Sequence, residues 1–135
     1  FTHQHLGEIG ESILQKQSSF NHSINFIPYR GNFTRGIIAT IYLDFESSLD
    51  VAKAIFNRHY VDSKFVFISD KNIDLKQVIN TNKCLLYLEK NDSKLMIISI
   101  IDNLIKGASG QAVQNMNLLF GFEENEGLKL KPSAY

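Results

Sequence analysis

The sequence lacks the features that mark disulfide-stabilised, membrane-spanning and nucleic-acid-binding proteins. Its 135 residues include one cysteine, which excludes an internal disulfide and is typical of a reducing compartment. Lys+Arg and Asp+Glu number 14 each, so there is no excess positive charge to attract nucleic acid or an anionic membrane. No apolar run approaches a membrane span, and residues 1–5 lack the basic and apolar regions of a signal peptide. We therefore expect a cytoplasmic protein that binds neither nucleic acid nor membrane.

The composition that remains is that of one soluble globular domain. Apolar residues make up 44% of the chain and charged residues 21%. A chain of this length can bury roughly two thirds of the surface that it exposes when unfolded. No internal repeat or low-complexity tract interrupts it.

Hydrophobic patterning predicts a mixture of helices and strands. The expected helical segments are 7–16, 48–60, the single turn 75–79 and a terminal helix at about 103–121, and the expected strands are 23–29, 35–45, 64–69, 84–89 and 94–101. The first two strands are predicted to form an antiparallel pair, and the last two a hairpin with its turn at 91–93. This order indicates an α+β fold with one mixed, largely antiparallel sheet and helices on one face.

The terminal segment contains the most informative stretch. Four small residues, 107–110, precede a helical pattern whose apolar positions fall on one side, and Gly121 is placed to cap its end. The apolar positions are Ala108, Ala112, Val113, Met116, Leu119 and Phe120. A helix start without side chains leaves its N–H groups open to another backbone or an anionic ligand. The same small residues would also let a helix pack closely on a sheet.

A histidine cluster lies at the beginning of the chain. His3 and His5 point to the same side if the stretch is extended, and Glu8 follows. Two imidazoles and a carboxylate are compatible with a metal site, with acid–base chemistry, or with ordinary exposed residues. The sequence pattern alone leaves these three interpretations open.

Residues 102–117 match every fixed position of D-N-L-x-K-G-A-x-G-Q-A-x-Q-N-x-N. This run closely resembles the C-terminal signature of the N-acetyl-gamma-glutamyl-phosphate reductase family, NADP-dependent semialdehyde dehydrogenases of arginine biosynthesis. The N-terminal cluster resembles that family's H-R-H-x-P-E motif, with Gln4 and Gly7 in place of Arg and Pro. Residues 28–36 resemble P-H-L-x-P-x-x-R-G at Pro28, Arg35 and Gly36 only.

The resemblance implies that residues 1–135 are the C-terminal catalytic and dimerisation domain of a larger enzyme. It implies the architecture of the glyceraldehyde-3-phosphate dehydrogenase catalytic domain, whose sheet builds the subunit interface of a homodimer or homotetramer. The terminal helix would pack on an upstream dinucleotide-binding domain, which also supplies the nucleophilic cysteine. Cys84 precedes an apolar run and is expected to be a half-buried strand residue instead.

The resemblance also implies roles for individual residues. His5 is expected to be the acid–base residue, with His3 as second choice, and no metal is expected. Glu8 and Arg35 would bind substrate; an arginine fork suits carboxylate or phosphate, although a solvated arginine at a strand start is the alternative. Asn103, Gly107, Ala108 and Gly110 would contact NADP. The alternative functions are a non-catalytic homodimerisation module, or another acyl-phosphate reductase such as aspartate-semialdehyde dehydrogenase.

Overall fold

The computed structural model describes residues 5–132, and the chain divides into two compact units, residues 1–32 and 33–135. The first unit contains helix α1 (His5–Lys16), followed by a segment without regular secondary structure. Because α1 begins at His5, the extended conformation considered for the histidine cluster is wrong at that residue, and His3 lies outside the described residues. The predicted strand 23–29 is also wrong.

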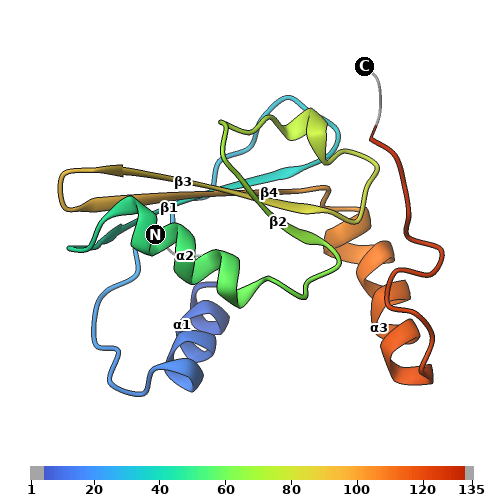
Figure 1. Ribbon diagram of the computed structural model, residues 1–135, viewed down its shortest axis with the longest axis horizontal. Coiled ribbons are helices and arrows are strands. Elements are labelled where there is room, and N and C mark those ends of the chain that lie inside the picture. The colour runs from blue at the N-terminus through green and yellow to red at the C-terminus, as the bar shows by residue number, and fades with distance from the viewer. Residues whose placement is uncertain (1–4, 133–135) are drawn as a thin grey trace. The chain divides into compact units, whose positions relative to one another are not determined.

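The second unit is built on a four-stranded sheet (Figure 1). Its strands are β1 (Ile37–Asp44), β2 (Val66–Ser69), β3 (Cys84–Asn91) and β4 (Lys94–Ile101), in the order β1-β4-β3-β2. The β1–β4 and β3–β4 pairs are antiparallel, whereas β2 runs parallel to β3. The sheet is therefore mixed and largely antiparallel, which confirms the predicted α+β class.

Strand β1 pairs with β4 rather than with residues 23–29. All eight β1 residues are in register with β4, from Ile37 opposite Ile101 to Asp44 opposite Lys94. The hairpin of β3 and β4 was predicted correctly, and its turn places Asp92 at φ 48°. The hairpin offers β1 an eight-residue apolar partner, whereas the 23–29 segment contains Pro28, which has no N–H to donate to a ladder.

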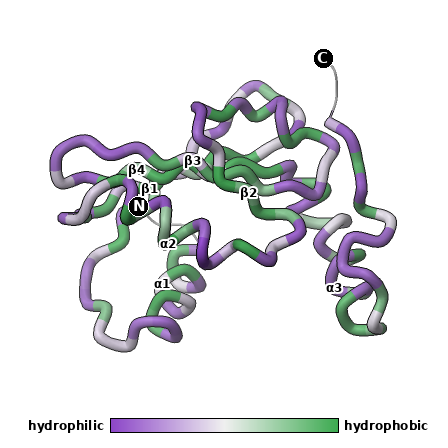
Figure 2. The backbone as a smooth tube through the Cα atoms, viewed as in Figure 1, coloured by the Kyte–Doolittle hydropathy of each residue, from purple (hydrophilic) through white to green (hydrophobic). Residues whose placement is uncertain are grey.

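Helix α2 (Leu49–His59) covers one face of the sheet and completes the core. Its N-cap is Ser48, whose hydroxyl accepts a hydrogen bond from the N–H of Val51 at 3.3 Å. Ala52 packs against strand residues of β3 and β4, namely Leu88, Leu95 and Ile97. Figure 2 shows hydrophobic residues along the strands, and Figure 1 shows that the loop carrying the short helix η1 (Leu75–Gln77) lies on the other side of the sheet from α2.

The sheet face opposite α2 is only partly covered. We call it the open face and define it by Ile38, Tyr42, Phe67, Leu85, Tyr87, Met96 and Ile98, whose registers place them on the same side of the four strands. Tyr42 is 68% exposed and Ile38 52%, while the central strands contribute half-buried side chains. A contiguous apolar surface of this kind is typical of an interaction site.

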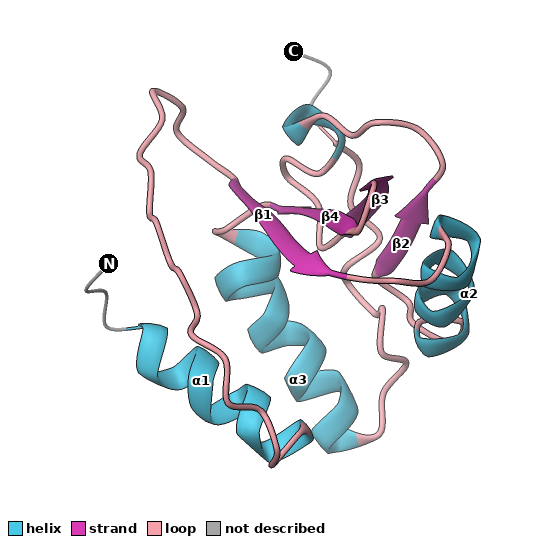
Figure 3. Ribbon diagram, turned by 90° about the vertical axis from the view of Figure 1, so that its left-hand side faces the viewer, coloured by secondary structure: helices cyan, strands magenta, loops and turns pink. Residues whose placement is uncertain are grey.

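The C-terminal helix was predicted at the correct place in the chain, and its apolar side is exposed. One π-helical turn, η2 (Ile105–Ser109), leads into α3 (Gly110–Phe120), which ends at Gly121 in the left-handed conformation, φ 73°. Gln114 and Asn117 are buried, whereas Met116, Leu119 and Phe120 are exposed. The polar side is buried because Asn117 donates to the carbonyls of Glu124 and Glu126. Figure 3 shows α3 extending away from the sheet.

Candidate functional site

Asp102, at the end of β4, is the centre of a buried polar cluster. Its side chain is fully buried. Oδ1 accepts hydrogen bonds from the N–H groups of Leu104 (2.8 Å) and Ile105 (3.0 Å), and Oδ2 accepts one from the N–H of Asn80 (2.7 Å). Asn80 adopts a left-handed conformation, φ 64°. The carboxylate thus holds together two loops that are 22 residues apart in sequence.

Arg35 is held beside this carboxylate. Its Nε lies 3.6 Å from Asp102 Oδ2, and its Nη1 donates to the side-chain oxygen of Asn80. The Arg35 side chain remains 31% exposed, so it is held by these partners on one side and is still partly accessible to solvent.

Gly36 and Asn103 complete the link between the two predicted motifs. The N–H of Gly36 donates to Asn103 Oδ1 at 2.6 Å across 67 residues of sequence. Gly36 has φ 111°, and a Cβ there would lie 2.6 Å from the Leu75 methyl groups. Glycine is therefore required after Arg35, both by the backbone conformation and by the close approach of η1. The structure brings Arg35 and Asn103 into one site.

The charge on Asp102 is maintained by its partners. Burial by itself raises the pKa of this carboxyl, but the N–H groups of Asn80, Leu104 and Ile105, with Arg35, outweigh burial and hold the pKa below its usual value. An ionised carboxylate at neutral pH follows. It orients the donors around it and balances the charge of Arg35.

The small residues before α3 do not form the open helix N-terminus that the sequence suggested. Because η2 precedes α3, the N–H groups of Gly107, Ser109 and Gly110 already bond to the carbonyls of Asp102, Leu104 and Ile105, respectively. What is left is an exposed backbone turn, residues 107–109, which we call the tip. The tip can be approached closely because it carries almost no side chain.

Gly107 and Gly110 differ in what surrounds them. A Cβ on Gly107 would have no neighbour closer than 3.7 Å, so its own chain does not require glycine there. A Cβ on Gly110 would lie 2.4 Å from Asn82 Oδ1 and 2.7 Å from Ile105 Cγ2. Gly110 is buried and has a packing reason to be glycine, while Gly107 and Ala108 face outward.

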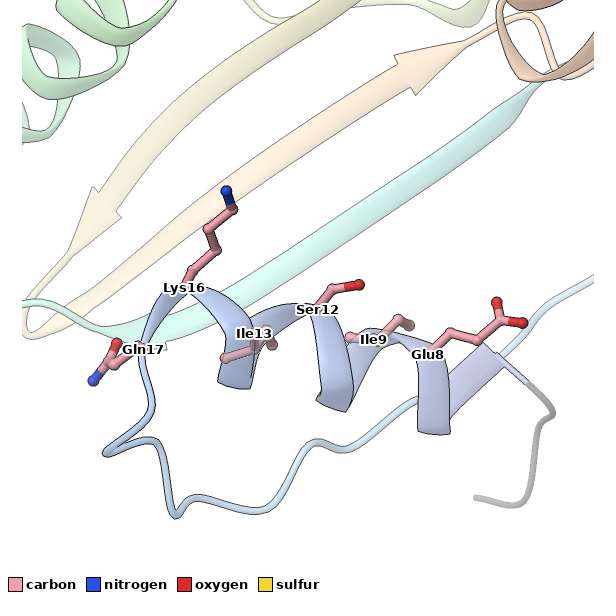
Figure 4. A pocket seen from close by; sticks show the side chains of 6 residues that line it. All are labelled: Glu8, Ile9, Ser12, Ile13, Lys16 and Gln17. Atoms are coloured by element: carbon pink, nitrogen blue, oxygen red, sulfur yellow. The ribbon is translucent and has the colours of Figure 1, made fainter.

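His5 and Glu8 belong to the first unit, in the first turn of α1. Both are exposed, and their spacing of three residues places them on the same side of the helix. Glu8 also borders an open hollow lined by α1 and by Gln17, the residue after it; Figure 4 shows it with Ile9, Ser12, Ile13 and Lys16. This hollow is a shallow helix surface rather than an enclosed pocket.

Two residues of the site, Asp102 and Asn80, were not predicted from the sequence. Asp102 was recognised only as the first letter of the terminal motif, although an acidic residue directly after a buried strand is a usable signal. Asn80 carried no signal, because its role depends on a left-handed turn that its neighbours do not indicate. Within residues 5–132, no three His, Cys, Asp or Glu side chains lie close enough to hold a metal ion. No helix in that range is long and apolar enough to cross a membrane.

Comparison with known proteins places these features in a family. Residues 1–103 match the model of the semialdehyde dehydrogenase dimerisation domain. Over all 135 residues the chain is 63% identical to N-acetyl-gamma-glutamyl-phosphate reductase from Parabacteroides distasonis and 60% identical to the enzyme of that name from Christiangramia forsetii, covering 42% of each. It is 54% identical over 132 residues to that from Karelsulcia muelleri, covering 98% of this chain and 41% of the relative.

These relatives are longer proteins, and this chain spans about two fifths of their length. Their names describe reductases, and the matched region is the part through which such dehydrogenases dimerise. The mixed sheet with its partly open face agrees with that assignment. The chain belongs to the semialdehyde dehydrogenase family, as its dimerisation domain.

Proposed function

We propose that this chain is the C-terminal part of an NADP-dependent reductase in arginine biosynthesis. The reaction converts N-acetyl-gamma-glutamyl phosphate to N-acetylglutamate 5-semialdehyde and phosphate. The observation that carries the proposal is the junction of the two motifs, in which Gly36, next to Arg35, bonds to Asn103 beside the buried Asp102. Relatives that cover the whole chain at high identity are named for this activity.

The reaction needs an acyl carrier and a residue that handles protons. In this proposal, a cysteine from the upstream part of the protein displaces phosphate to form a thioester. His5 raises the thiolate fraction of that cysteine and later donates a proton to the developing alkoxide. An imidazole suits both roles because its unperturbed pKa is near neutrality. His3 is the second choice for the same role.

The polar residues would orient the substrate. Arg35 suits the substrate carboxylate or phosphate, because a planar guanidinium binds either one through two hydrogen bonds. The buried carboxylate of Asp102 already fixes its direction. Glu8, exposed in the first turn of α1, would bind polar groups of the substrate or orient the imidazole.

The tip suits the nicotinamide end of the cofactor. Gly107 and Ala108 are exposed and nearly free of side chains, so a flat ring can lie against their backbone. Asn103 lies at the same end of the sheet, and Gly110 supports the turn from inside. NADPH bound there supplies the hydride that reduces the thioester.

The exposed apolar side of α3 supports a contact with the upstream domain. Leu119 is 79% exposed and Phe120 68%, and Met116 lies on the same side of the helix. Burying three such side chains stabilises an interface by several kcal/mol, at roughly 25 cal/mol per Å² of apolar area. We assign residues 103–121 to this docking role.

The open face would form the interface with a second copy of the chain. Its most exposed members, Ile38 and Tyr42, lie beside the half-buried side chains of the central strands. An isologous contact between two such faces buries the same apolar surface on both subunits. The assembly is then a homodimer, or a homotetramer built from it, in the cytoplasm.

The test uses the full-length parent enzyme and the substitution His5→Asn. Phosphate-dependent reduction of NADP with N-acetylglutamate semialdehyde is followed at 340 nm. The matched control is His59→Asn, because His59 is also exposed on a helix but packs edge-on against Tyr60. We expect wild-type turnover, a loss of about 10²–10⁴-fold in His5→Asn, and little change in the control.

Each other outcome has a definite meaning. Turnover that survives His5→Asn moves the acid–base role to His3. Turnover with L-aspartate semialdehyde, but not with the acetylated substrate, indicates another acyl-phosphate reductase. No turnover by the wild type, with a dimer still present, indicates a non-catalytic assembly module.

A further inference from the structure

Lys106, the second residue of η2, is half-buried, and its ammonium is directed toward side chains of its own domain. Its Nζ donates to Gln111 Oε1 at 2.8 Å and to Gln114 Oε1 at 2.7 Å. The same Nζ lies 5.3 Å from the centroid of the Phe65 ring. An ammonium has three N–H donors, and here two meet amide oxygens while the group also faces an aromatic ring. A phosphate contact would have to displace these partners.

The acceptor Gln114 belongs to a larger network that fixes its orientation. Its Nε2 donates to Glu124 Oε1 at 2.7 Å, so its oxygen must face Lys106. That oxygen also accepts from Asn82 Nδ2 at 3.1 Å. Asn82 Oδ1 is then directed at Gly110, and this oxygen is buried and has no hydrogen-bond partner. Because it lies so close to Gly110, it leaves no room for a side chain at that position. The network thereby connects η2, α3 and the loop before β3.

This network fixes the residues on both sides of the tip. Lys106 precedes residues 107–109 and is anchored by its ammonium, while Gly110 follows them and is wedged against Asn82. The tip itself is exposed, and its hydrogen bonds are those of its backbone and that of the Ser109 hydroxyl to the carbonyl of Leu104. Its position therefore depends on its two anchors.

We propose that Lys106 is a positioning residue, which sets the tip where the nicotinamide end of the cofactor binds and does not touch the ligand itself. This inference rests on the function proposed above. It gives a role to Lys106, which lies in the sequence between the buried Asp102 and the exposed Gly107. The charge of Lys106 is balanced by hydrogen bonds within the domain, so the tip can bind the nicotinamide ring rather than a phosphate.

The electrostatics agree with an internal role. Burial lowers the pKa of the Lys106 ammonium below its usual value, and the nearby Cys84 and Glu124 offset part of that effect. A lysine that served as a solvated phosphate contact would not be desolvated before its ligand arrived. The two amide oxygens and the ring take the place of the lost water.

The test is Lys106→Met in the full-length parent enzyme, which keeps the stem volume and removes the three donors. Lys83→Met is the matched control, because Lys83 also sits over an aromatic ring, Phe67, at 5.9 Å, but is not anchored next to the tip. NADPH binding is measured by fluorescence titration, together with kcat, both KM values and the melting temperature. Gln111→Met is a milder second variant if Lys106→Met folds poorly.

We expect Lys106→Met to weaken NADPH binding and raise the KM for NADP by about tenfold, because a hydrogen bond to a charged group is lost at each acceptor. The kcat and the KM for the semialdehyde should change by less than roughly threefold, and Gln111→Met should give a smaller loss of the same kind. Lys83→Met should bind NADPH like the wild type.

Three results would overturn the inference. Wild-type NADPH binding by Lys106→Met leaves the proposed function intact and removes the positioning role. A fall in kcat and melting temperature, together with a parallel rise in both KM values, makes Lys106 a purely structural residue. A wild type that neither binds NADPH nor turns over removes the proposed function and this inference together.

Discussion

Asp102→Asn tests the most consequential feature of the structure, the buried carboxylate that joins Arg35, Asn80 and η2. The amide is the same size, but only one of its two polar atoms can accept. Suppose that the amide oxygen keeps the hydrogen bonds from the N–H groups of Leu104 and Ile105. The NH₂ group then takes the place of Oδ2, which lies 2.7 Å from the N of Asn80 and 3.6 Å from the Nε of Arg35. Two donors then oppose each other in a site that water does not reach.

The magnitude follows from these contacts. A buried N–H left without an acceptor costs about 1–3 kcal/mol, and weakening the remaining charge-assisted bonds adds about 1 kcal/mol. The ion pair adds little, because its atoms are 3.6 Å apart and Arg35 is partly exposed. We expect a loss of about 3 kcal/mol in the free energy of unfolding at pH 7. Urea denaturation followed by circular dichroism measures it.

Asp44→Asn is the matched control. Asp44 also pairs with a cation, Lys94 at 2.5 Å, but both side chains are largely exposed. We therefore expect a change within about 0.5 kcal/mol for this variant. An equal loss in the two variants, or a loss below about 1 kcal/mol in Asp102→Asn, would refute the assignment of Asp102 as the centre of the cluster.

The pH dependence gives a second check on the same residue. The folded pKa of Asp102 is lowered, so its stabilisation is fully present above the unfolded value, near 3.8, and is lost as the pH falls through the lower folded value. The stability difference between wild type and Asp102→Asn should therefore be constant from pH 7 to about 5 and shrink below pH 4. A difference that does not change with acidification contradicts an ionised Asp102.

Two further predictions concern the tip and the sheet. Gly110→Ala should lower the free energy of unfolding by about 1–3 kcal/mol, because the new Cβ meets Asn82 Oδ1 at 2.4 Å. Gly107→Ala, the control, should leave it unchanged. Thermal unfolding compares the two variants, and equal effects would contradict the packing argument. Tyr42→Asp on the open face should shift the parent enzyme toward monomers in sedimentation velocity, since it buries a charge in the proposed interface. Val61→Asp, at a similarly exposed position outside the sheet, should leave the dimer intact. If the dimer is unchanged in both variants, the open face is not the subunit interface.

Local patterns in the sequence predicted most of the secondary structure. Helix α2 was found from its apolar spacing and the N-cap Ser48, and the β3–β4 hairpin from two apolar runs around a turn. The helix η1 and the left-handed cap at Gly121 were also found. These features depend on residues within a few positions of one another, so the sequence encodes them directly.

The pairing of distant segments was not predicted, since it depends on competition between partners. β1 was assigned to the preceding segment, but it joins β4, where eight residues match in register. The burial of the polar side of α3 was likewise not predicted, because Gln114 and Asn117 are buried only when residues 124–126 return along the helix. The spacing of apolar residues in a sequence identifies the apolar side of a helix, but it does not identify the segment that covers either side.

The candidate site shows the same division. The sequence determined the family and the residue types at Arg35, Asn103 and Gly107, and it marked the terminal motif as the place to look. Only the tertiary structure showed that Asp102 binds three backbone N–H groups and orients Arg35, that Lys106 faces inward, and that η2 uses the N–H groups expected to be open. A hydrogen bond between residues 22 or 67 positions apart exists only after the chain has folded, so no local pattern can record it.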